Sequence, residues 1–408
     1  MPASSRSKRV LIYSHDSFGL GHVSRCRTIA NALVEADEAV SVLILSGSPM
    51  IGSYEFHSGI DFVRVPGVVK QLSGEYDSAN LRVGVEHTME MRTRIIRDTA
   101  DIFRPDLFIV DKEPLGLRGE VGPTLRLLKD RGTPLVLGLR DVMDDPAALA
   151  QEWERKKIVP ALRDLYDEIW IYGLPQICNP LEGIELPKSV QRKMVYTGYL
   201  HRSLPQGPGL PVPLQKLDAP YILVTTGGGG DGEDVVDWVL RAYENDPKMP
   251  HPALLVLGPF MHSDRQAEFL LRAAKLDKVE AITFDAQMEH VMSRAIGVVA
   301  MGGYNTFCEI VSFDKRALIV PRTRPRMEQF LRAAKAEELG LAAMLEDDGV
   351  RDWKKMATAL RQLPQQSLPS DVVVPGLLDG LNNVNRLAQQ ALERGRRPAS
   401  LRLAQRKR

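Results

Sequence analysis

Short apolar runs alternate with amphipathic segments along the whole chain. In the first half the runs lie at 9–14, 40–45, 61–65, 106–111, 134–139 and 168–173. In the second half they lie at 221–226, 253–258, 280–284, 297–301 and 316–321. Continuous apolar runs separated by helical patterns are typical of parallel strands that crossover helices cover on both faces. The pattern predicts an α/β protein with doubly wound parallel sheets.

A segment rich in proline and glycine divides this pattern. Residues 201–220 contain five prolines and two glycines, which disfavour helices and strands. A chain of 408 residues is also longer than one hydrophobic core usually sustains. We expect Rossmann-like domains at 1–200 and 221–380, a linker at 201–220, and a C-terminal helix and basic tail at 381–408. Because such sheets bind ligands at the carboxyl ends of their strands, two facing domains would form a cleft.

Composition narrows the class of protein. The 53 Lys and Arg residues balance 52 Asp and Glu residues, and a net charge of +1 does not favour a nucleic-acid partner. Three distant cysteines, Cys26, Cys178 and Cys308, are typical of reduced thiols. The first residues lack the apolar region of a secretion signal, and no window reaches the roughly 20 apolar residues that span a bilayer. We expect a cytoplasmic protein.

The stretch SHDSFGLGHVSRCRTIANAL (14–33) places Gly19, Gly21 and His22 where a predicted strand gives way to a helix. Glycine lets the backbone approach a ligand, and a helix N-terminus offers unpaired N–H groups to an anion. Histidine suits general-base chemistry because its ordinary pKa, about 6.5, lies near neutral pH. The alternative is that His22 only packs against the sheet edge or caps a turn.

Two further strand ends in the first half carry candidate groups. Asp111 ends one predicted strand, and Arg140 and Asp141 follow the next. Asp111 can orient His22 or itself act as the base. The alternative for each is an internal salt bridge or a helix cap.

A second glycine-rich turn, in VTTGGGGDGEDVVDWVL (224–240), includes Gly227, Gly228 and Gly229. Its amides can cradle a diphosphate, although the sequence matches neither a Walker loop nor the dinucleotide fingerprint. The acidic residues that follow, Asp231, Glu233 and Asp234, are expected to complement the helix dipole rather than to oppose a phosphate or hold a metal.

A third turn begins at Gly302 and Gly303. We expect Asn305 and Thr306 to cap the next helix, and Glu309, one turn further in, to accept hydrogen bonds from a ribose diol. The alternative for Glu309 is a solvated helix charge.

A polar cluster follows the next predicted strand. It contains Arg322, Arg324, Arg326, Glu328 and Gln329. Arginine suits phosphate groups, and Gln or Glu suits sugar hydroxyls.

In this order the motifs resemble the nucleotide-sugar glycosyltransferases of the two-Rossmann-domain GT-B fold, especially the family of the N-acetylglucosaminyltransferase that completes lipid II. The resemblance covers most of the chain, and its most specific match is the ribose segment GGYNTFCE (302–309). GLGH (19–22) is similar to the family's turn with a candidate base, TTGGGG (225–230) to its phosphate turn, and FDAQM (284–288) to its base-proximal loop. GYLHR (198–202) is similar to a Gly-x-x-x-Arg segment, with Tyr-Leu in place of Asn-Pro. Glu328 and Gln329 match the pair that reads sugar hydroxyls.

The resemblance implies a metal-independent, inverting hexosyltransferase without a cofactor. It would move a sugar from a nucleoside diphosphate sugar, with UDP as the expected carrier, to an acceptor hydroxyl in bacterial cell-surface or exopolysaccharide synthesis. The implied catalytic residues are His22 and Asp111. The implied nucleotide-sugar-binding residues are Gly19, Gly21, Arg202, Gly227, Gly228, Gly229, Phe284, Met288, Gly302, Gly303, Asn305, Thr306, Glu309, Glu328 and Gln329.

Two alternatives remain open. GLGHVSRCRTIANAL (19–33) is also similar to the start of the UDP-sugar hydrolases of nonulosonic acid synthesis, which use the histidine to activate water. Fold does not separate transfer from hydrolysis, but the long first domain, with its inserted segment at 66–104, favours a transferase with an acceptor site. A non-catalytic nucleotide-sugar-binding protein is the other alternative, and it would not need His22.

The acceptor is the least specified partner. Arg92, Arg94 and Arg97, together with the basic tail from Arg394, can hold a protein at an anionic membrane face, at about 1 kcal/mol for each basic residue. In that case the acceptor is lipid-linked, and otherwise it is a soluble saccharide or small molecule. The alternative is a solvated tail and an ordinary helix face.

Overall fold

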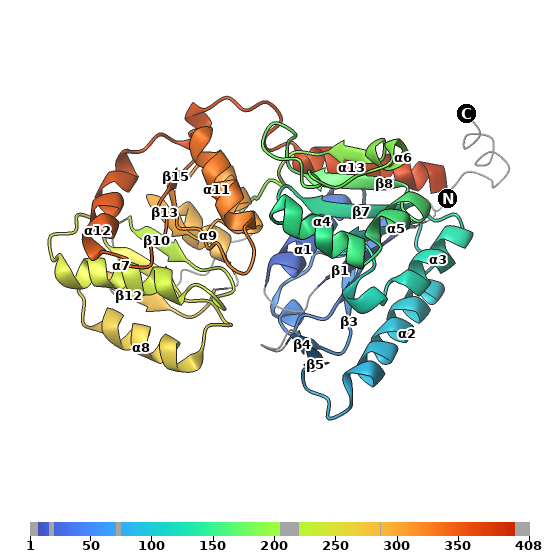
Figure 1. Cartoon of the computed structure of the whole chain (residues 1–408), viewed down its shortest axis with the longest axis horizontal. Helices are drawn as coiled ribbons and strands as arrows, with labels where there is room; N and C mark the ends of the chain where they lie inside the picture. The colour runs from blue at the N-terminus through green and yellow to red at the C-terminus, as the bar shows by residue number, and fades with distance from the viewer. Residues whose placement is uncertain (1–6, 16–19, 71–74, 205–219, 286, 396–408) are drawn as a thin grey trace, which may run out of the picture. The chain divides into compact units, whose positions relative to one another are not determined.

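The chain divides into two compact units. The computed structural model describes residues 7–15, 20–70, 75–204, 220–285 and 287–395. The first unit comprises Met1–Leu200 and Asp379–Arg408, and the second comprises His201–Leu378. Figure 1 labels their elements.

The first unit is built on a seven-stranded parallel sheet with the order β3-β2-β1-β6-β7-β8-β9. Its strands are β1 (Lys8–Ser14), β2 (Val40–Ser46), β3 (Ile60–Arg64), β6 (Leu107–Asp111), β7 (Leu135–Arg140), β8 (Glu168–Tyr172) and β9 (Met194–Tyr196). Its helices are α1 (Gly21–Ala36), α2 (Val85–Phe103), α3 (Gly122–Asp130), α4 (Pro146–Arg155), α5 (Ile158–Asp164), α6 (Lys188–Gln191) and α13 (Gly380–Gly395). β4 (Val68–Lys70) and β5 (Tyr76–Ser78) form a separate antiparallel pair. Short 3-10 helices lie at Ile51–Ser53 and Leu117–Gly119.

The second unit contains a six-stranded parallel sheet with the order β12-β11-β10-β13-β14-β15. Its strands are β10 (Ile222–Thr225), β11 (Ala253–Val256), β12 (Val279–Ile282), β13 (Gly297–Ala300), β14 (Ala317–Ile319) and β15 (Ala343–Met344). Its helices are α7 (Glu233–Asn245), α8 (Ser263–Ala274), α9 (Met288–Ser293), α10 (Tyr304–Ser312), α11 (Glu328–Glu338) and α12 (Trp353–Gln362). Two 3-10 helices, Leu363–Gln365 and Pro369–Asp371, follow.

The central strand β10 shows why the predicted strands are apolar at every position. Ile222 and Val224 belong to one buried cluster, whereas Leu223 belongs to another. Successive side chains of a strand point to opposite faces, so a sheet covered on both faces needs an apolar residue at every position. The doubly wound α/β fold predicted from the sequence is confirmed, with a strand at each of the eleven apolar runs.

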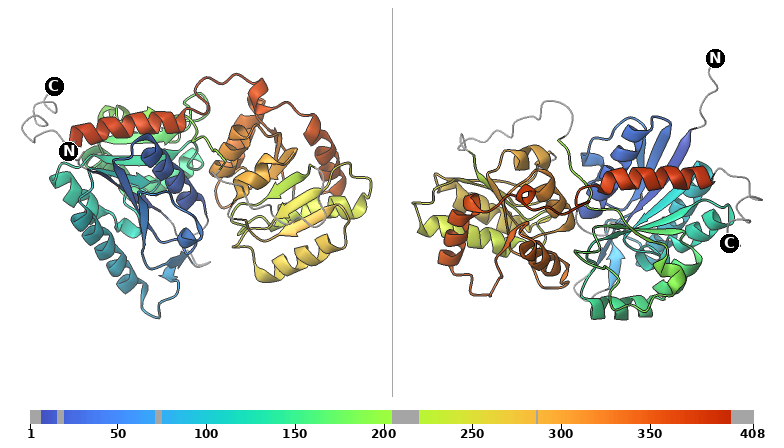
Figure 2. Two further views of the ribbon diagram at one scale, coloured as in Figure 1. Left: turned by 180° about the vertical axis from the view of Figure 1, so that it is seen from behind. Right: turned by 90° about the horizontal axis from the view of Figure 1, so that it is seen from above.

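The C-terminal helix α13 packs on the first unit, although it follows the second unit in sequence (Figure 2). The amide of Gly380 donates to the carbonyl of Tyr199 at 3.1 Å, and Asn383 Nδ2 donates to the carbonyl of Thr197 at 2.9 Å. A Cβ on Gly380 would lie 2.3 Å from that Tyr199 oxygen, so the backbone contact requires glycine. Arg394 forms an ion pair with Glu168 at the far end of the helix. The helix also contacts α1, which carries His22.

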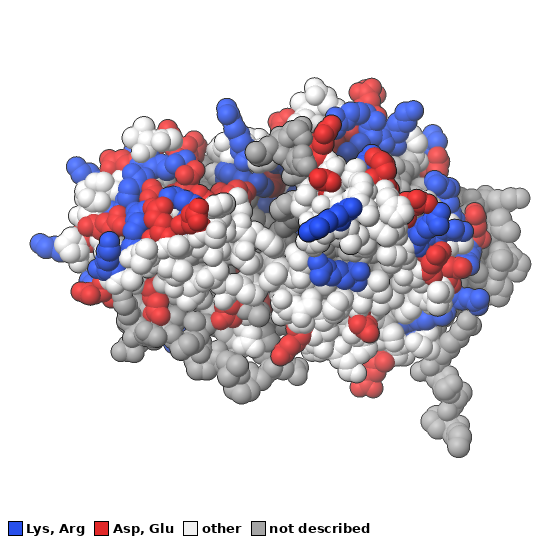
Figure 3. All heavy atoms as spheres, turned by 90° about the horizontal axis from the view of Figure 1, so that it is seen from below, with Lys and Arg blue, Asp and Glu red and all other residues white. Residues whose placement is uncertain are grey.

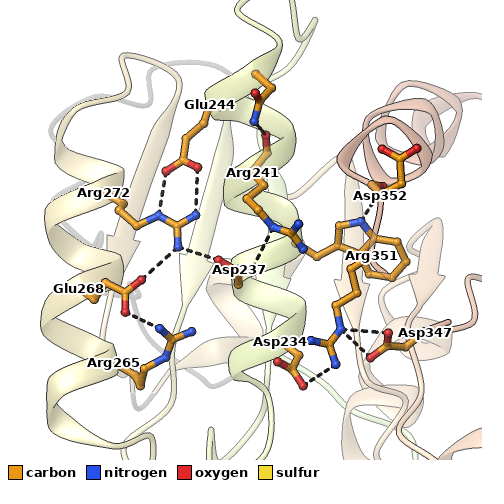
Figure 4. Close-up of polar contacts among 12 residues, drawn as sticks. Asp234, Asp237, Arg241, Glu244, Arg265, Glu268, Arg272, Asp347, Arg351 and Asp352 are labelled. Atoms are coloured by element: carbon orange, nitrogen blue, oxygen red, sulfur yellow. Dashed lines mark hydrogen bonds and ion pairs between the residues drawn. The ribbon is translucent and has the colours of Figure 1, made fainter. Parts of the chain in front are cut away.

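An ion-pair network covers the outer side of α7 and α8 in the second unit (Figure 4). Arg272 on α8 makes two parallel bonds to Glu244 on α7, at 2.8 and 2.9 Å, and a third to Asp237 at 2.7 Å. A separate pair beside it joins Arg351 to Asp234, in the first turn of α7, at 2.7 Å. Figure 3 shows acidic and basic side chains interleaved over the second unit, at the left. The network ties neighbouring helices together, and we assign it no binding role.

Candidate active site

His22 lies in the first turn of α1, at the carboxyl end of β1. The helix begins at Gly21, so His22 is its second residue. His22 Nδ1 lies 2.5 Å from Oδ2 of Asp111, the last residue of β6. β6 is the neighbour of β1 in the sheet, which brings the two strand ends together. Gly19 falls outside the residues that the structure describes.

Arg25 completes this group, and the sequence analysis missed it. Arg25 donates from Nε to Asp111 Oδ1 at 2.7 Å and from Nη2 to Oδ2 at 2.6 Å. A two-pronged bond between guanidinium and carboxylate fixes the orientation of both groups. Arg25 follows His22 by three residues on one helix face, and this spacing was the available signal.

The electrostatics of the group favour a neutral histidine beside an ionised aspartate. Burial lowers the pKa of His22 to about 4, and this effect outweighs the nearby charge of Asp111. Burial alone would raise the pKa of Asp111, but Arg25 and His22 hold it well below its ordinary value. An ionised Asp111 is an acceptor only, so His22 Nδ1 carries the hydrogen and Nε2 is the proton-accepting atom.

The other strand-end candidates of the first unit have structural partners. Asp141 is fully buried and accepts a hydrogen bond from the Tyr199 hydroxyl at 2.8 Å. Arg92, assigned above to a surface patch, is instead 1% exposed and is paired with Glu120. The predicted membrane contact of residues 89–97 is therefore wrong for Arg92, because an arginine that is buried in an ion pair does not face a lipid surface. The tail at 396–408 lies outside the described residues.

In the second unit, the turn after β10 is shaped by its glycines. Gly227 and Gly229 have φ angles of +64° and +87°. A Cβ on Gly229 would lie 2.3 Å from the Leu257 carbonyl oxygen, so this close approach requires glycine. The Gly228 carbonyl accepts from the amide of Phe260 at 2.9 Å. Glu233 and Asp234 lie in the first turn of α7, as expected for residues that complement its dipole.

The turn after β13 leads into α10. Gly302 has a φ angle of +80°, and Gly303 takes the N-cap position of α10. Asn305 and Thr306 are therefore the second and third residues of the helix, and the prediction that they cap it is wrong. Asn305 Oδ1 instead accepts from Arg202 Nη2 at 3.0 Å.

Glu309 lies one turn further along α10, partly exposed. Arg332, which the sequence analysis missed, is 1% exposed and donates to the Gly302 carbonyl at 2.8 Å. This bond connects α11 to the glycine turn.

Glu328 and Gln329 form the first turn of α11, and both are largely buried. Arg322 Nη2 donates to Glu328 Oε1 at 2.6 Å, and the Arg322 amide donates to Gln329 Oε1 at 3.2 Å. Arg322 Nη1 also lies 2.6 Å from Asp231 Oδ2, in the segment that follows β10. Since β10, β13 and β14 are neighbours in the sheet, their three carboxyl-end turns meet at one edge of the second unit.

Phe284 and Met288 follow β12 at the same end of this sheet. Both are partly buried, and Met288 begins α9 and packs against a buried apolar cluster. Within the described ranges, no group of three or more His, Cys, Asp or Glu side chains is arranged to hold a metal ion. Within the same ranges, the helices are too short or too polar to cross a bilayer.

Comparison with known proteins identifies the second unit. Residues 222–370 match the family model of the glycosyltransferase family 28 C-terminal domain, which spans all six strands of that unit. No curated protein matches the chain by sequence.

Solved structures share the fold across nearly the whole chain. The calicheamicin glycosyltransferase CalG4 is 14% identical, with 95% of this chain and 99% of that chain covered and a TM-score of 0.60. A UDP-glucosyltransferase from Polygonum tinctorium is 13% identical, with coverage of 96% and 98% and a TM-score of 0.61. MurG of Acinetobacter baumannii is 13% identical, with coverage of 95% and 98% and a TM-score of 0.51.

At these identities the structural likeness establishes the fold, which is GT-B, as predicted. The family match adds the class of protein, so the chain is a glycosyltransferase of the GT-B type. Its second unit is a glycosyltransferase family 28 C-terminal domain. The resemblance stated from the sequence motifs is confirmed for the fold of the chain and for the family of its second unit.

Proposed function

We propose that this protein is an inverting glycosyltransferase that takes its sugar from a UDP-sugar and uses His22 as the general base. The observation that carries the proposal is the group formed by His22, Asp111 and Arg25. A neutral imidazole with one nitrogen bonded to a buried, ionised carboxylate is the arrangement that lets the other nitrogen accept a proton.

In the proposed reaction the acceptor hydroxyl gives its proton to His22 Nε2. The hydroxyl oxygen attacks the anomeric carbon while the bond from that carbon to the diphosphate oxygen breaks on the opposite face, which inverts the configuration. Asp111 then stabilises the imidazolium, and Arg25 keeps Asp111 ionised. With the pKa of His22 at about 4, the imidazole is a proton acceptor throughout the neutral range.

We assign donor binding to the second unit. The amides around Gly227, Gly228 and Gly229 suit the diphosphate, and Glu309 suits the ribose diol. Glu328 and Gln329 are assigned to the sugar hydroxyls, and Phe284 and Met288 to the base. The residues that hold the turn before Glu309 in place are assigned to the same donor site; they are Arg202, Gly302, Gly303, Asn305 and Thr306. The family 28 domain supports a nucleotide-sugar donor, and relatives whose names include UDP support the uridine nucleotide.

We further propose that transfer needs no metal ion. The N-termini of α7, α10 and α11 lie at the edge where the glycine turns meet, and helix N-termini stabilise phosphate charge. The acceptor would be a saccharide, lipid-linked or small-molecule hydroxyl compound. Cell-surface glycan synthesis is the setting that the sequence resemblance suggests.

Calorimetric titration with UDP tests donor binding. Glu309→Gln should weaken the affinity for UDP by at least tenfold, because a charged hydrogen-bond acceptor is worth roughly 1.5 to 3 kcal/mol. Glu338→Gln is the control, since Glu338 is an exposed helix residue that pairs with Lys335. Equal affinities of wild type and Glu309→Gln would remove Glu309 from the site.

A second experiment separates transfer from hydrolysis. The protein is incubated with UDP-sugars alone and then with candidate acceptors, with and without a metal chelator. The proposal predicts slow sugar release without acceptor, faster UDP release with acceptor, and no effect of the chelator. Rapid stoichiometric hydrolysis without acceptor would contradict transfer.

A further inference from the structure

A second histidine, His15, lies beside His22. His15 directly follows β1, and the two imidazole rings pack edge to face with their centroids 5.6 Å apart. The Tyr13 hydroxyl lies 3.5 Å from His15 Nδ1. The charged groups that act on His15 are Asp111, Lys112 and Glu113, which follow one another at the end of β6. The function proposed above gives His15 no role.

A buried chain of hydrogen bonds connects His15 to the inserted helix α2. Arg92 on α2 donates from Nε and Nη2 to the two carboxylate oxygens of Glu120, at 2.6 and 2.7 Å. The Tyr13 hydroxyl donates to Glu120 Oε1 at 2.6 Å. Arg92, Glu120 and Tyr13 are each at most 2% exposed. The chain therefore runs from the inserted segment to the end of β1 without crossing solvent.

Counting hydrogens fixes the direction of this chain. A carboxylate bound by arginine accepts only, so the single hydrogen of the Tyr13 hydroxyl points to Glu120. The Tyr13 oxygen already accepts from the Leu117 amide at 3.3 Å, and toward His15 it again acts as an acceptor. A hydrogen bond across the 3.5 Å between Tyr13 and His15 thus requires the hydrogen on His15 Nδ1, which leaves Nε2 as the acceptor atom of a neutral ring.

We infer that His15 is a positioning residue for His22, held in one tautomer by the chain from Arg92 through Glu120 and Tyr13. The inference rests on the proposed role of His22 as the base. The His15 ring covers one edge of the His22 ring, which keeps water from it and holds Nδ1 of His22 toward Asp111. Helix α2 is thereby connected to His22 through side-chain contacts, although the helix begins more than 60 residues after His22 in the sequence.

Burial and the neighbouring charged groups keep both His15 and His22 neutral. Burial, with smaller contributions from the nearby His22 and Lys112, lowers the pKa of His15 to about 3, although Glu113 and Asp111 act in the opposite direction. The groups that act on His22 are Asp111, Arg25 and Lys112. A neutral His15 leaves His22 as the ring that takes up the acceptor proton.

Imidazole NMR of the full-length protein, without any donor, tests the inference. Nitrogen-15 shifts at neutral pH should show the Nδ1–H tautomer for both His15 and His22. Tyr13→Phe removes the acceptor and should shift His15 to a mixture of tautomers. Arg92→Gln should act in the same direction, whereas Arg94→Gln, an exposed neighbour on α2 that pairs with Glu90, should leave His15 unchanged.

The effect on His22 is read from its titration. His15→Ala admits water to the edge of the His22 ring and should raise the pKa of His22 by about one unit, whereas His15→Phe keeps the ring and should leave it unchanged. An unchanged His15 tautomer in Tyr13→Phe, or an unchanged His22 titration in His15→Ala, would overturn the inference. If Tyr13→Phe does not fold, the titration of His22 in His15→Ala and His15→Phe still tests the inference, because His15 is partly exposed and tolerates substitution better than a buried residue. UDP calorimetry tests the proposed function independently.

Discussion

At the residue scale, burial and paired charges set the state of the candidate base. His22 is neutral because its ring is withdrawn from water, and Asp111 is ionised because Arg25 binds both of its oxygens. A neutral histidine beside an ionised aspartate is the combination that a proton-accepting pair needs. These charge states also make folding depend on pH.

We predict that the first unit loses stability as the pH falls from 6.5 toward 4. The pKa of His22 is lowered from 6.5 to about 4, so in this range the unfolded chain binds a proton that the folded chain does not. Above pH 6.5 the free energy of unfolding does not depend on His22. Below pH 6.5 it falls by about 1.4 kcal/mol for each pH unit, because one such group is protonated only in the unfolded chain. His15 adds in the same direction, down to about pH 3.

Urea unfolding of wild type and His22→Gln between pH 4.5 and 7.5 measures this effect. The variant should show a shallower pH dependence, with the two curves diverging below pH 6.5. Parallel curves would show that His22 has an ordinary pKa in the folded protein.

The sequence predicted part of this group. His22 and Asp111 were found because each ends or follows an apolar run, and strand ends are recognisable. Glu120 was missed because its partners are far away in the chain; the bond from Tyr13 spans 107 positions. Arg25 was missed although its spacing from His22 was a local signal, because its carboxylate partner, Asp111, lies on another strand. A pattern of local periodicity holds no information on such pairs.

At the element scale, the turns that follow parallel strands carry the candidate binding groups. The sequence located their strands because runs buried on both faces are continuously apolar. It missed β9 and β15, of three and two residues, and the β4–β5 pair, because elements this short have no measurable period. The N-cap of α10 was placed two to three residues too late, at Asn305 and Thr306, because Gly303 takes that position.

The turn after β10 gives a prediction with an internal control. Gly229→Ala should destabilise the second unit by at least roughly 1 to 3 kcal/mol, since φ is +87° and the new Cβ would meet the Leu257 carbonyl. Gly230→Ala, one residue on, meets nothing within 4 Å and should change stability by less than about 0.5 kcal/mol. Hydrogen exchange in the second unit, read by mass spectrometry, distinguishes the two; equal protection would contradict the turn geometry.

At the scale of the whole molecule, the chain crosses twice between its units. The boundary near residue 200 follows from the composition of the linker, whereas the return of α13 to the first unit does not. Its amphipathic pattern shows that α13 has an apolar face but not which unit the face covers. That assignment depends on contacts such as Gly380 with Tyr199, which only the folded chain brings together.

Leu392 on α13 is 1% exposed, and Leu392→Ala should destabilise the first unit by about 2 to 5 kcal/mol. The second unit should keep its hydrogen-exchange protection. Gln389→Ala, on the exposed side of the same helix, is the control and should be nearly neutral. Loss of protection in the second unit instead of the first would contradict the observed division of the chain.

In the proposed sugar transfer, His22 accepts the proton of the acceptor hydroxyl. The most direct test is the rate of UDP release, with a donor and acceptor at saturation, for wild type and His22→Ala. We predict a fall of ~10²- to 10⁴-fold, the usual contribution of a general base, with the affinity for UDP unchanged. A variant that turns over at nearly the wild-type rate would show that another group takes the proton.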